Sequence, residues 1–264
     1  MCRWAAYLGA PIFLSEVVSD PSHSLIEQSR EADECKTRTN ADGFGLAWYD
    51  ARPEPGLYRD VYPAWSDPNL RALASQVRSG LFLSHIRAST GTAISRNNCH
   101  PFAVGTWSFM HNGQIGGFEN FRKQADMLIP DDLYPDRRGA TDSEVMFLLA
   151  LANGLHRDAR GAMEASILTL EALSRERGAG PHMRVAAAFS NGTSLFAIRY
   201  ASDSRAPSLY YRWSDELGGW TVVSEPLERD QAGWIEVPPG SFCTFLGKDV
   251  SIQPFLRQAK PLAA

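Results

Sequence analysis

The sequence predicts an α+β fold in which two sheets pack against each other and helices cover their outer faces. Short apolar or alternating segments, bounded by Gly, Pro, Asn and Asp, lie toward both ends of the chain, and helix-like segments fill the middle. No internal repeat appears, and the Pro- and Gly-containing stretches 52–56 and 130–139 are typical of surface loops rather than linkers. We therefore expect one domain that spans residues 1–264.

Several segments have the length and composition of strands. Each runs apolar, or alternates between apolar and polar residues, over a short span that ends at turn-forming residues. The expected strands are residues 3–8, 45–49, 81–86, 106–111, 184–189, 195–200, 209–213, 220–224 and 242–246.

Other segments have helical periodicity or helix-start signals. Ser22 suits the N-cap of the first expected helix, and Asp142 and Glu144 suit the start of the fourth, where negative charge is favoured. Apolar residues such as Ile167 and Leu170 recur at near-helical spacing in the fifth. The expected helices are residues 22–30, 69–78, 118–128, 142–153 and 161–177.

Charge and composition exclude several classes of protein. The formal net charge is −4 and no basic stripe is present, which argues against binding to nucleic acid. No apolar run reaches the ~18–20 residues of a membrane span, and the N-terminus lacks the features of a signal peptide. Four cysteines without a CxxC pair indicate a reducing, cytoplasmic compartment, in which Cys35 and Cys243 are expected to be small buried side chains.

The second residue, Cys2, is a candidate nucleophile. Removal of Met1 leaves one residue that carries both a thiol and a free α-amine. The thiol is a strong nucleophile, and the amine has an unperturbed pKa of about 7.7–8.0, so the amine can act as its base. Many chains begin with Met-Cys without such a role, so this start gains meaning only from motifs further along the chain.

Two charged residues are candidates for binding a substrate. Arg87 ends an apolar strand-like stretch, and a guanidinium binds a carboxylate through two parallel hydrogen bonds. Asp142 follows Thr141 at an expected helix start, where its carboxylate can form a pocket wall and hold an ammonium group. Each also has a purely structural interpretation, as a surface salt bridge for Arg87 and as part of a helix cap for Asp142.

The dipeptide Asn112-Gly113 has two interpretations. It follows an expected strand, and Asn-Gly is typical of a turn. Alternatively, the Asn112 side-chain amide and the Gly113 backbone N–H form an oxyanion hole, because glycine lets the backbone approach a ligand closely.

The segment Asn98-Cys99-His100-Pro101-Phe102 is a shaped loop, because Pro101 restricts His100 to an extended conformation. Its adjacent Cys and His raise the question of a metal. Adjacent residues rarely supply two ligands, and no partner cluster has zinc-like spacing. We therefore expect no metal and no cofactor.

Together these motifs resemble those of class II glutamine amidotransferase domains, which are N-terminal-nucleophile hydrolases. They occur in the family's order over about residues 2–145, as Cys2, Asp42-Gly43-Phe44-Gly45-Leu46-Ala47, His85-Ile86-Arg87, Asn98-Cys99-His100-Pro101-Phe102, His111-Asn112-Gly113 and Thr141-Asp142-Ser143-Glu144. The resemblance implies a four-layer αββα sandwich of two mainly antiparallel sheets.

The resemblance also implies a role for each site residue. Cys2 attacks the γ-amide carbonyl of glutamine or a glutamine-like γ-glutamyl molecule, and Asn112 and Gly113 stabilise the oxyanion. Arg87 binds the substrate α-carboxylate, and Asp142 binds its α-ammonium. Cleavage passes through a γ-glutamyl thioester, which water converts to glutamate.

Three functional alternatives remain. We expect no synthase domain in the chain, so either a separate subunit accepts the ammonia or the chain is a stand-alone hydrolase. The stand-alone branch includes the amidohydrolase of ergothioneine synthesis, which removes a γ-glutamyl group from a sulfur-containing conjugate. The ending His100-Pro101-Phe102 is more similar to another stand-alone bacterial branch of unassigned substrate, and both resemblances stay open. The third alternative is a non-catalytic binding or regulatory protein that retains the fold. Two features depart from many family members: Gly91 stands four residues after Arg87, with Thr92 at the fifth position, and Thr39 stands where an arginine is common.

Overall fold

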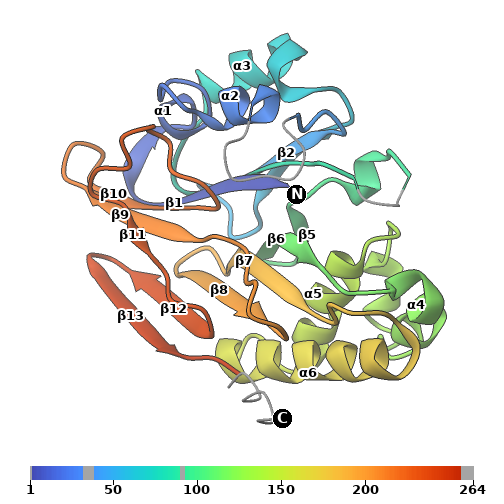
Figure 1. The fold of residues 1–264 in the computed structure, drawn as a ribbon. Coiled ribbons are helices and arrows are strands. Elements are labelled where there is room, and N and C mark those ends of the chain that lie inside the picture. Colours follow the sequence, from blue (N-terminus) through green and yellow to red (C-terminus); the bar gives the residue numbers. More distant parts are fainter. Residues whose placement is uncertain (1, 32–38, 90–92, 257–264) are drawn as a thin grey trace.

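The computed structural model describes residues 2–31, 39–89 and 93–256, and these form two sheets that pack face to face (Figure 1). Met1, Cys35, Gly91 and Thr92 lie outside the described residues. A seven-stranded sheet has the order β11-β9-β10-β1-β4-β2-β3, and a six-stranded sheet has the order β13-β12-β8-β7-β6-β5. The described strand pairings in both sheets are antiparallel, as the resemblance implies.

The strands of the first sheet are β1 (Arg3–Phe13), β2 (Phe44–Tyr49), β3 (Gly56–Asp60), β4 (Arg78–Ile86), β9 (Tyr210–Ser214), β10 (Gly219–Val223) and β11 (Ile235–Glu236). The strands of the second sheet are β5 (Phe102–Val104), β6 (Trp107–Gln114), β7 (Arg184–Ser190), β8 (Leu195–Ala201), β12 (Ser241–Leu246) and β13 (Asp249–Pro254). Each of the expected strands is therefore present, with boundaries that differ by a few residues.

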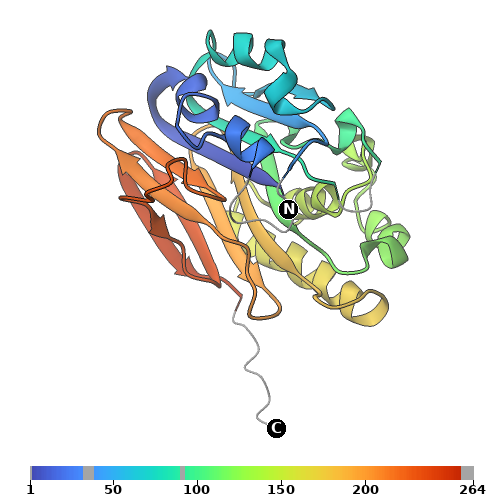
Figure 2. The ribbon, with the colours of Figure 1, turned by 45° about the horizontal axis from the view of Figure 1, so that its top comes forward.

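Helices cover the outer face of each sheet and complete the four layers (Figure 2). The first sheet is covered by α1 (Ser15–Val18), α2 (Leu25–Arg30) and α3 (Pro68–Ala74), and the second by α4 (Phe118–Asp126), α5 (Asp142–Ala152) and α6 (Ala159–Arg177). Short 3-10 turns are η1 (Ala64–Ser66), η2 (Arg96–Asn98) and η3 (Tyr134–Asp136). None of the helices in the described parts of the chain has the length and apolar character that a membrane crossing needs.

The core consists of one apolar cluster between the sheets and one beneath each helical layer. Strand β1 shows how alternation builds it, because Trp4 and Ala6 face the second sheet whereas Ala5 and Tyr7 face the helices. Cys243 is fully buried in the cluster between the sheets, as expected, and burial raises the pKa of its thiol to about 12.

Helix α3 ends earlier than the sequence predicts. It stops at Ala74, and Arg78, which was expected at its end, begins β4 instead. The Leu14 N–H donates to the Val77 carbonyl, and Arg78 then pairs with Phe13 of β1. Val77 and Arg78 therefore pair with Leu14 and with the central strand β1, respectively, and do not extend the helix, although both residue types are tolerated in helices.

Helix α2 begins later than expected. Ser24, not Ser22, is its N-cap, and the Ser24 Oγ accepts from the Glu27 N–H at 3.4 Å. The His23 N–H donates to the Leu227 carbonyl, so a distant segment fixes the chain before the helix starts.

The sequence analysis also missed several short or polar strands. Strand β3 starts at Gly56, which was expected in a loop, and β13 is mostly exposed, so it lacks the apolar alternation that marks a strand. Strands β5 and β11 have only a few residues each.

The topology places the start of β1 at the junction of the two sheets. Strand β1 lies between β10 and β4 in the middle of its sheet, and Figure 1 shows its first residues beside β5 and β6 of the other. The residue before β1 is Cys2.

Candidate active site

Four of the five predicted site residues line one cavity. Cys2, Arg87, Gly113 and Asp142 come from separate segments and border a space of about 490 Å³. Asn112, the fifth, is buried and is not among the lining residues, and its side-chain Oδ1 has no hydrogen-bond partner among the described residues. The cavity lies where β1 begins, β4 and β6 end and α5 begins.

Contacts from Ala88 and Arg3 hold Cys2 in place. The Ala88 N–H donates to the Cys2 Sγ at 3.4 Å. Arg3 is fully buried, its Nε lies 2.7 Å from Glu225 Oε2, and its Nη1 donates to the Cys2 carbonyl at 3.2 Å. Because a guanidinium is costly to bury without a counter-charge, the ion pair fixes the backbone from which the thiol projects.

A clamp formed by Asp42 and Gly43 holds Arg87. The Arg87 N–H donates to the Gly43 carbonyl at 2.8 Å, Arg87 Nη1 donates to the Asp42 carbonyl at 3.3 Å, and the Asp42 carboxylate accepts from the Ser89 N–H at 2.7 Å. Gly43 has a φ of +112°, and a Cβ there would lie 2.6 Å from the Asp60 carbonyl oxygen. The first glycine of the Asp42-Gly43-Phe44-Gly45 motif is therefore explained by its backbone conformation and by the lack of space for a side chain.

Asn112 and Gly113 do not form a turn. Both lie within β6, where Asn112 pairs with Ala186 and Gly113 pairs with Val185 of β7. Gly113 has a φ of +152°, and a Cβ there would clash with the carbonyl oxygen of Arg184. Glycine therefore lets β6 pass close to β7 while its own backbone borders the cavity.

Asp142 is the first residue of α5 and is fixed by backbone groups. Thr141 is the N-cap, and its Oγ1 accepts from the Glu144 N–H at 3.2 Å, as the capping prediction requires. The Asp142 Oδ2 accepts from the Ile115 N–H at 2.9 Å, and Oδ1 accepts from the Ser143 N–H at 2.7 Å. A carboxylate oxygen accepts two hydrogen bonds, so Oδ2 retains the capacity to bind a cation in the cavity.

The sequence analysis missed the role of Glu144. Its Oε2 lies 2.7 Å from Arg137 Nη1 and accepts from the Gly139 N–H at 2.8 Å. Both ionised side chains are almost fully buried, and together they hold the loop that brings Ala140 to the cavity wall. The Thr-x-x-Glu spacing indicated a cap, but it did not indicate this loop anchor.

His111 lines the cavity as a neutral side chain. Its Nε2 donates to the Arg184 carbonyl at 3.2 Å, so in the neutral ring Nδ1 accepts from the Ser143 Oγ at 2.9 Å. Burial lowers the pKa of His111, although the nearby Asp142 carboxylate acts in the opposite direction.

Two more histidines lie beside it, and sequence reasoning gave neither of them a role. The His85 Nε2 donates to the His111 carbonyl at 3.2 Å, which joins β4 to β6 across the two sheets. Burial lowers the pKa of His85 to about 3. His100 lines the cavity, whereas Cys99 is buried and its Sγ contacts the Asp60 carbonyl at 3.4 Å. No group of three or more His, Cys, Asp or Glu among the described residues is arranged to hold a metal ion.

The buried His85 predicts a loss of stability in acid. Its pKa is about 3 in the folded chain against an ordinary value of 6.5, so between these values the unfolded chain binds a proton that the folded chain does not. The free energy of unfolding should therefore fall as pH drops through this window, by about 1.4 kcal/mol per pH unit for one histidine, with no such contribution above about pH 6.5.

Urea unfolding at several pH values tests this expectation. His85→Asn should make the slope of the unfolding free energy against pH shallower by about 1.4 kcal/mol per unit between about pH 5.5 and 4. His156 is exposed, so His156→Asn is the matched control and should keep the wild-type slope. Equal slopes in the wild type and His85→Asn would contradict the expectation.

Sequence comparisons place the chain among known proteins. The family model described as class II glutamine amidotransferases matches residues 13–211. The chain is 29% identical over 306 residues to the probable glutamine amidotransferase DUG3 of Saccharomyces cerevisiae, covering 97% of this chain and 85% of that protein. It is 27% identical over 269 residues to the gamma-glutamyl-hercynylcysteine sulfoxide hydrolase of Mycobacterium tuberculosis, covering 99% of this chain and 100% of that protein.

Solved structures agree with the sequence comparisons. A glutamine aminotransferase class-II domain protein from Silicibacter pomeroyi superposes with a TM-score of 0.80 at 53% identity, covering 97% of this chain and 100% of that chain. The glutamine phosphoribosylpyrophosphate amidotransferase of Bacillus subtilis shares the fold, with a TM-score of 0.63 at 16% identity over 97% of this chain and 49% of that chain. This chain is an enzyme that belongs to the class II glutamine amidotransferases.

Proposed function

We propose that the enzyme hydrolyses the γ-glutamyl amide bond of glutamine or a glutamine-like molecule, with Cys2 as the nucleophile. The observation that carries this proposal is the meeting of Cys2, Arg87, Gly113 and Asp142 at one cavity. The cavity therefore brings together a thiol, a guanidinium, a glycine backbone and a carboxylate, and the charged groups match those that a γ-glutamyl substrate presents.

The proposed reaction requires removal of Met1, so that the α-amine of Cys2 is free to act as the base. The thiol proton passes to this amine while Sγ bonds to the γ-carbonyl carbon. The C–N bond of the tetrahedral intermediate then breaks, and the amine returns the proton to the leaving nitrogen. Water attacks the resulting thioester, the C–S bond breaks, and glutamate leaves with the thiol restored.

The binding roles follow from the charges. A γ-glutamyl group ends in an α-carboxylate and an α-ammonium, and the cavity offers Arg87 to the first and Asp142 to the second. The Gly113 N–H and the Asn112 amide are the proposed donors to the oxyanion, where preorganised hydrogen bonds act most strongly on the transition state.

Replacement of Cys2 tests the mechanism. Cys2→Ala should abolish release of glutamate from glutamine and from γ-glutamyl amides, because the thioester cannot form. The assay should use protein whose mass shows that Met1 has been removed. Cys243→Ala removes a buried thiol that does not line the cavity, and it should retain activity. Full turnover by Cys2→Ala would end the proposal, and a wild type that binds glutamate without cleaving any amide would favour the non-catalytic alternative.

Replacement of Asn112 tests the oxyanion hole. Asn112→Ala should lower kcat by about 10²–10³-fold, equivalent to about 3–4 kcal/mol, and leave KM nearly unchanged, because the donor acts mainly in the transition state. Measuring kcat and the thermal midpoint of unfolding on one sample separates catalysis from folding. A lower midpoint with normal kcat would show that Asn112 only supports β6.

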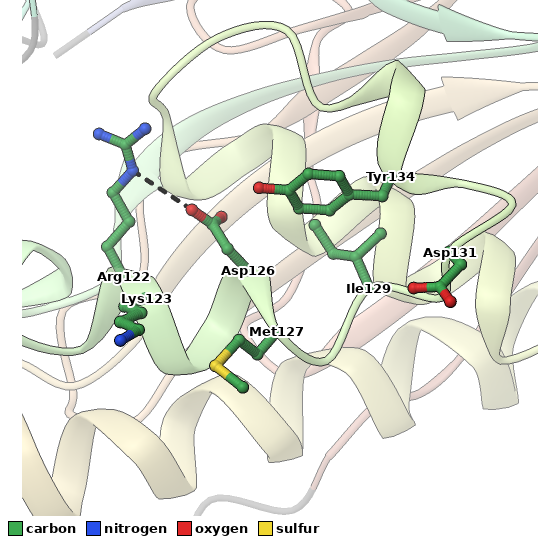
Figure 3. Close-up of a pocket in the computed structure, with 7 residues that line it drawn as sticks. All are labelled: Arg122, Lys123, Asp126, Met127, Ile129, Asp131 and Tyr134. Carbon is green, nitrogen blue, oxygen red and sulfur yellow. Dashed lines mark ion pairs between the residues drawn. The ribbon is translucent and has the colours of Figure 1, made fainter.

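The shape of the cavity favours a substrate larger than glutamine as a second candidate. Its lining extends along α4 through Phe118, Glu119 and Arg122, beyond the residues proposed to hold the γ-glutamyl group. Arg122 also borders a second cavity of about 600 Å³. In Figure 3, this second cavity is lined by Asp126 at the end of α4, by Met127 directly after the helix, and by Tyr134.

We infer that the leaving group of such a substrate extends along α4 toward the second cavity. Arg122 Nε lies 3.5 Å from Asp126 Oδ2. The Arg122 side chain is nearly half exposed, so its guanidinium is accessible to an anionic group on the conjugate. The name of the Mycobacterium tuberculosis relative, a gamma-glutamyl-hercynylcysteine sulfoxide hydrolase, supports a γ-glutamyl conjugate. An ammonia-supplying enzyme with a separate acceptor subunit is the competing candidate.

A side-by-side assay of glutamine, γ-glutamylcysteine and a γ-glutamyl thioether distinguishes these candidates. The conjugates should exceed glutamine in kcat/KM, and Arg122→Gln should lower kcat/KM for carboxylate-bearing conjugates by about tenfold while leaving glutamine unchanged. Arg177→Gln, on α6 and away from both cavities, is the matched control. Glutamine clearly exceeding every conjugate, with a rate that rises when a synthase subunit is added, would favour ammonia supply.

A further inference from the structure

Arg137 is a buried cation that the proposed mechanism does not use. It lies in the loop between α4 and α5, and only 3% of its side chain is exposed. Its Nε lies 2.9 Å from Asp126 Oδ1, and its Nη1 lies 2.7 Å from Glu144 Oε2. Because a buried guanidinium is costly without counter-charges, these two carboxylates hold Arg137 at one position.

Arg137 also contacts the chain directly before Asp142. Its Nη1 donates to the Thr141 carbonyl at 2.9 Å, and Thr141 is the N-cap of α5. Glu144, its ion-pair partner, lies in the first turn of the same helix. One guanidinium therefore bonds to residues on both sides of Asp142 in the sequence, and it fixes the backbone from which the Asp142 carboxylate projects.

The charges around Arg137 suit a position near a site for an ammonium group. A cation beside the start of a helix is normally unfavourable, because the helix N-terminus carries partial positive charge. Asp126 and Glu144 supply two carboxylates to this guanidinium, although Asp126 also approaches Arg122 Nε at 3.5 Å. Arg137 can therefore position Asp142 while carboxylates offset the positive charge that would repel an ammonium group.

We propose that Arg137 is a positioning residue that orients Asp142 and thereby contributes to selection of substrates with a free α-ammonium. This inference rests on the proposed role of Asp142 in binding the γ-glutamyl group. The Ile115 and Ser143 N–H groups orient the Asp142 carboxylate, and Arg137 fixes the start of the helix that carries it. Loss of the guanidinium should therefore weaken substrate binding rather than bond cleavage at Cys2.

The test compares Arg137→Gln, which removes the charge, with Arg137→Lys, which keeps a cation but loses the planar fork of donors. The substrates are glutamine and glutaramate, which lacks only the α-ammonium of glutamine. Arg137→Gln should lower kcat/KM for glutamine by about tenfold, mainly through KM, and Arg137→Lys should recover part of the loss. For glutaramate, the ratio of wild type to Arg137→Gln should approach one.

A double mutant separates positioning of Asp142 from general support of the fold. If Arg137 acts through Asp142, adding Arg137→Gln to Asp142→Asn should cause little further loss of affinity for glutamate, whereas independent effects would add. Arg138→Gln is the matched control on the same loop, because its side chain is 65% exposed and its ion pair with Asp136 spans 3.5 Å. This control should keep the wild-type kcat/KM for both amides.

Thermal midpoints and binding measurements keep the outcome separate from folding and from the proposed function. Dissociation constants for glutamate and for glutarate, which lacks the α-ammonium, should follow the same pattern as the two amides. If Arg137→Gln fails to fold, Arg137→Lys should still show a loss confined to glutamine and glutamate. Equal losses with and without the α-ammonium, wild-type affinity for glutamate in the folded variants, or additive losses in the double mutant would each overturn the inference. A wild type that binds glutamate but cleaves neither amide would instead refute the proposed hydrolysis, and the dissociation constants would still test the role of Arg137.

Discussion

The buried ion pair between Arg3 and Glu225 is the interaction on which the position of Cys2 depends. Both side chains are almost completely excluded from water, and His23 Nε2 approaches the other carboxylate oxygen at 2.6 Å. Removing one partner would leave an uncompensated buried charge, which is far more costly than losing a surface pair. The start of β1 is thus tied to the segment that directly follows β10, far along the sequence.

That anchor matters because the site is divided between two sheets. Cys2 precedes β1 and Arg87 follows β4 of the first sheet, whereas Gly113 lies in β6 of the second, so the distances between them depend on how the sheets pack. Hydrogen bonds cross between the sheets near the cavity, from Trp4 Nε1 to the Ala186 carbonyl and from His85 Nε2 to the His111 carbonyl. The Trp4 and His85 side chains are both buried, so water competes little for these two hydrogen bonds, and they fix how the sheets pack at the cavity.

The sequence predicted those parts of the molecule whose signal is local. Apolar alternation identified the central strands, and the order of short motifs identified four residues that line the cavity. Features that depend on distant partners were not predictable, because nothing near Arg3 indicates Glu225 and nothing near Arg137 distinguishes its ion pair with Glu144 from a helix cap. Polar edge strands such as β13 were not predicted for a different reason, because an exposed strand needs no apolar pattern.

The dipeptide Asn112-Gly113 shows how strand pairing overrides local preference. Local chemistry favours a turn, yet both residues pair within β6. The missing side chain of Gly113 leaves space that a Cβ would take from the Arg184 carbonyl and, at 2.6 Å, from His111 Nε2. The same absence therefore permits the hydrogen bond that orients His111, and the Gly113 backbone borders the cavity. Glycine weakens the interior of a strand, but at position 113 it permits the close approach of β6 to β7 that shapes the cavity wall.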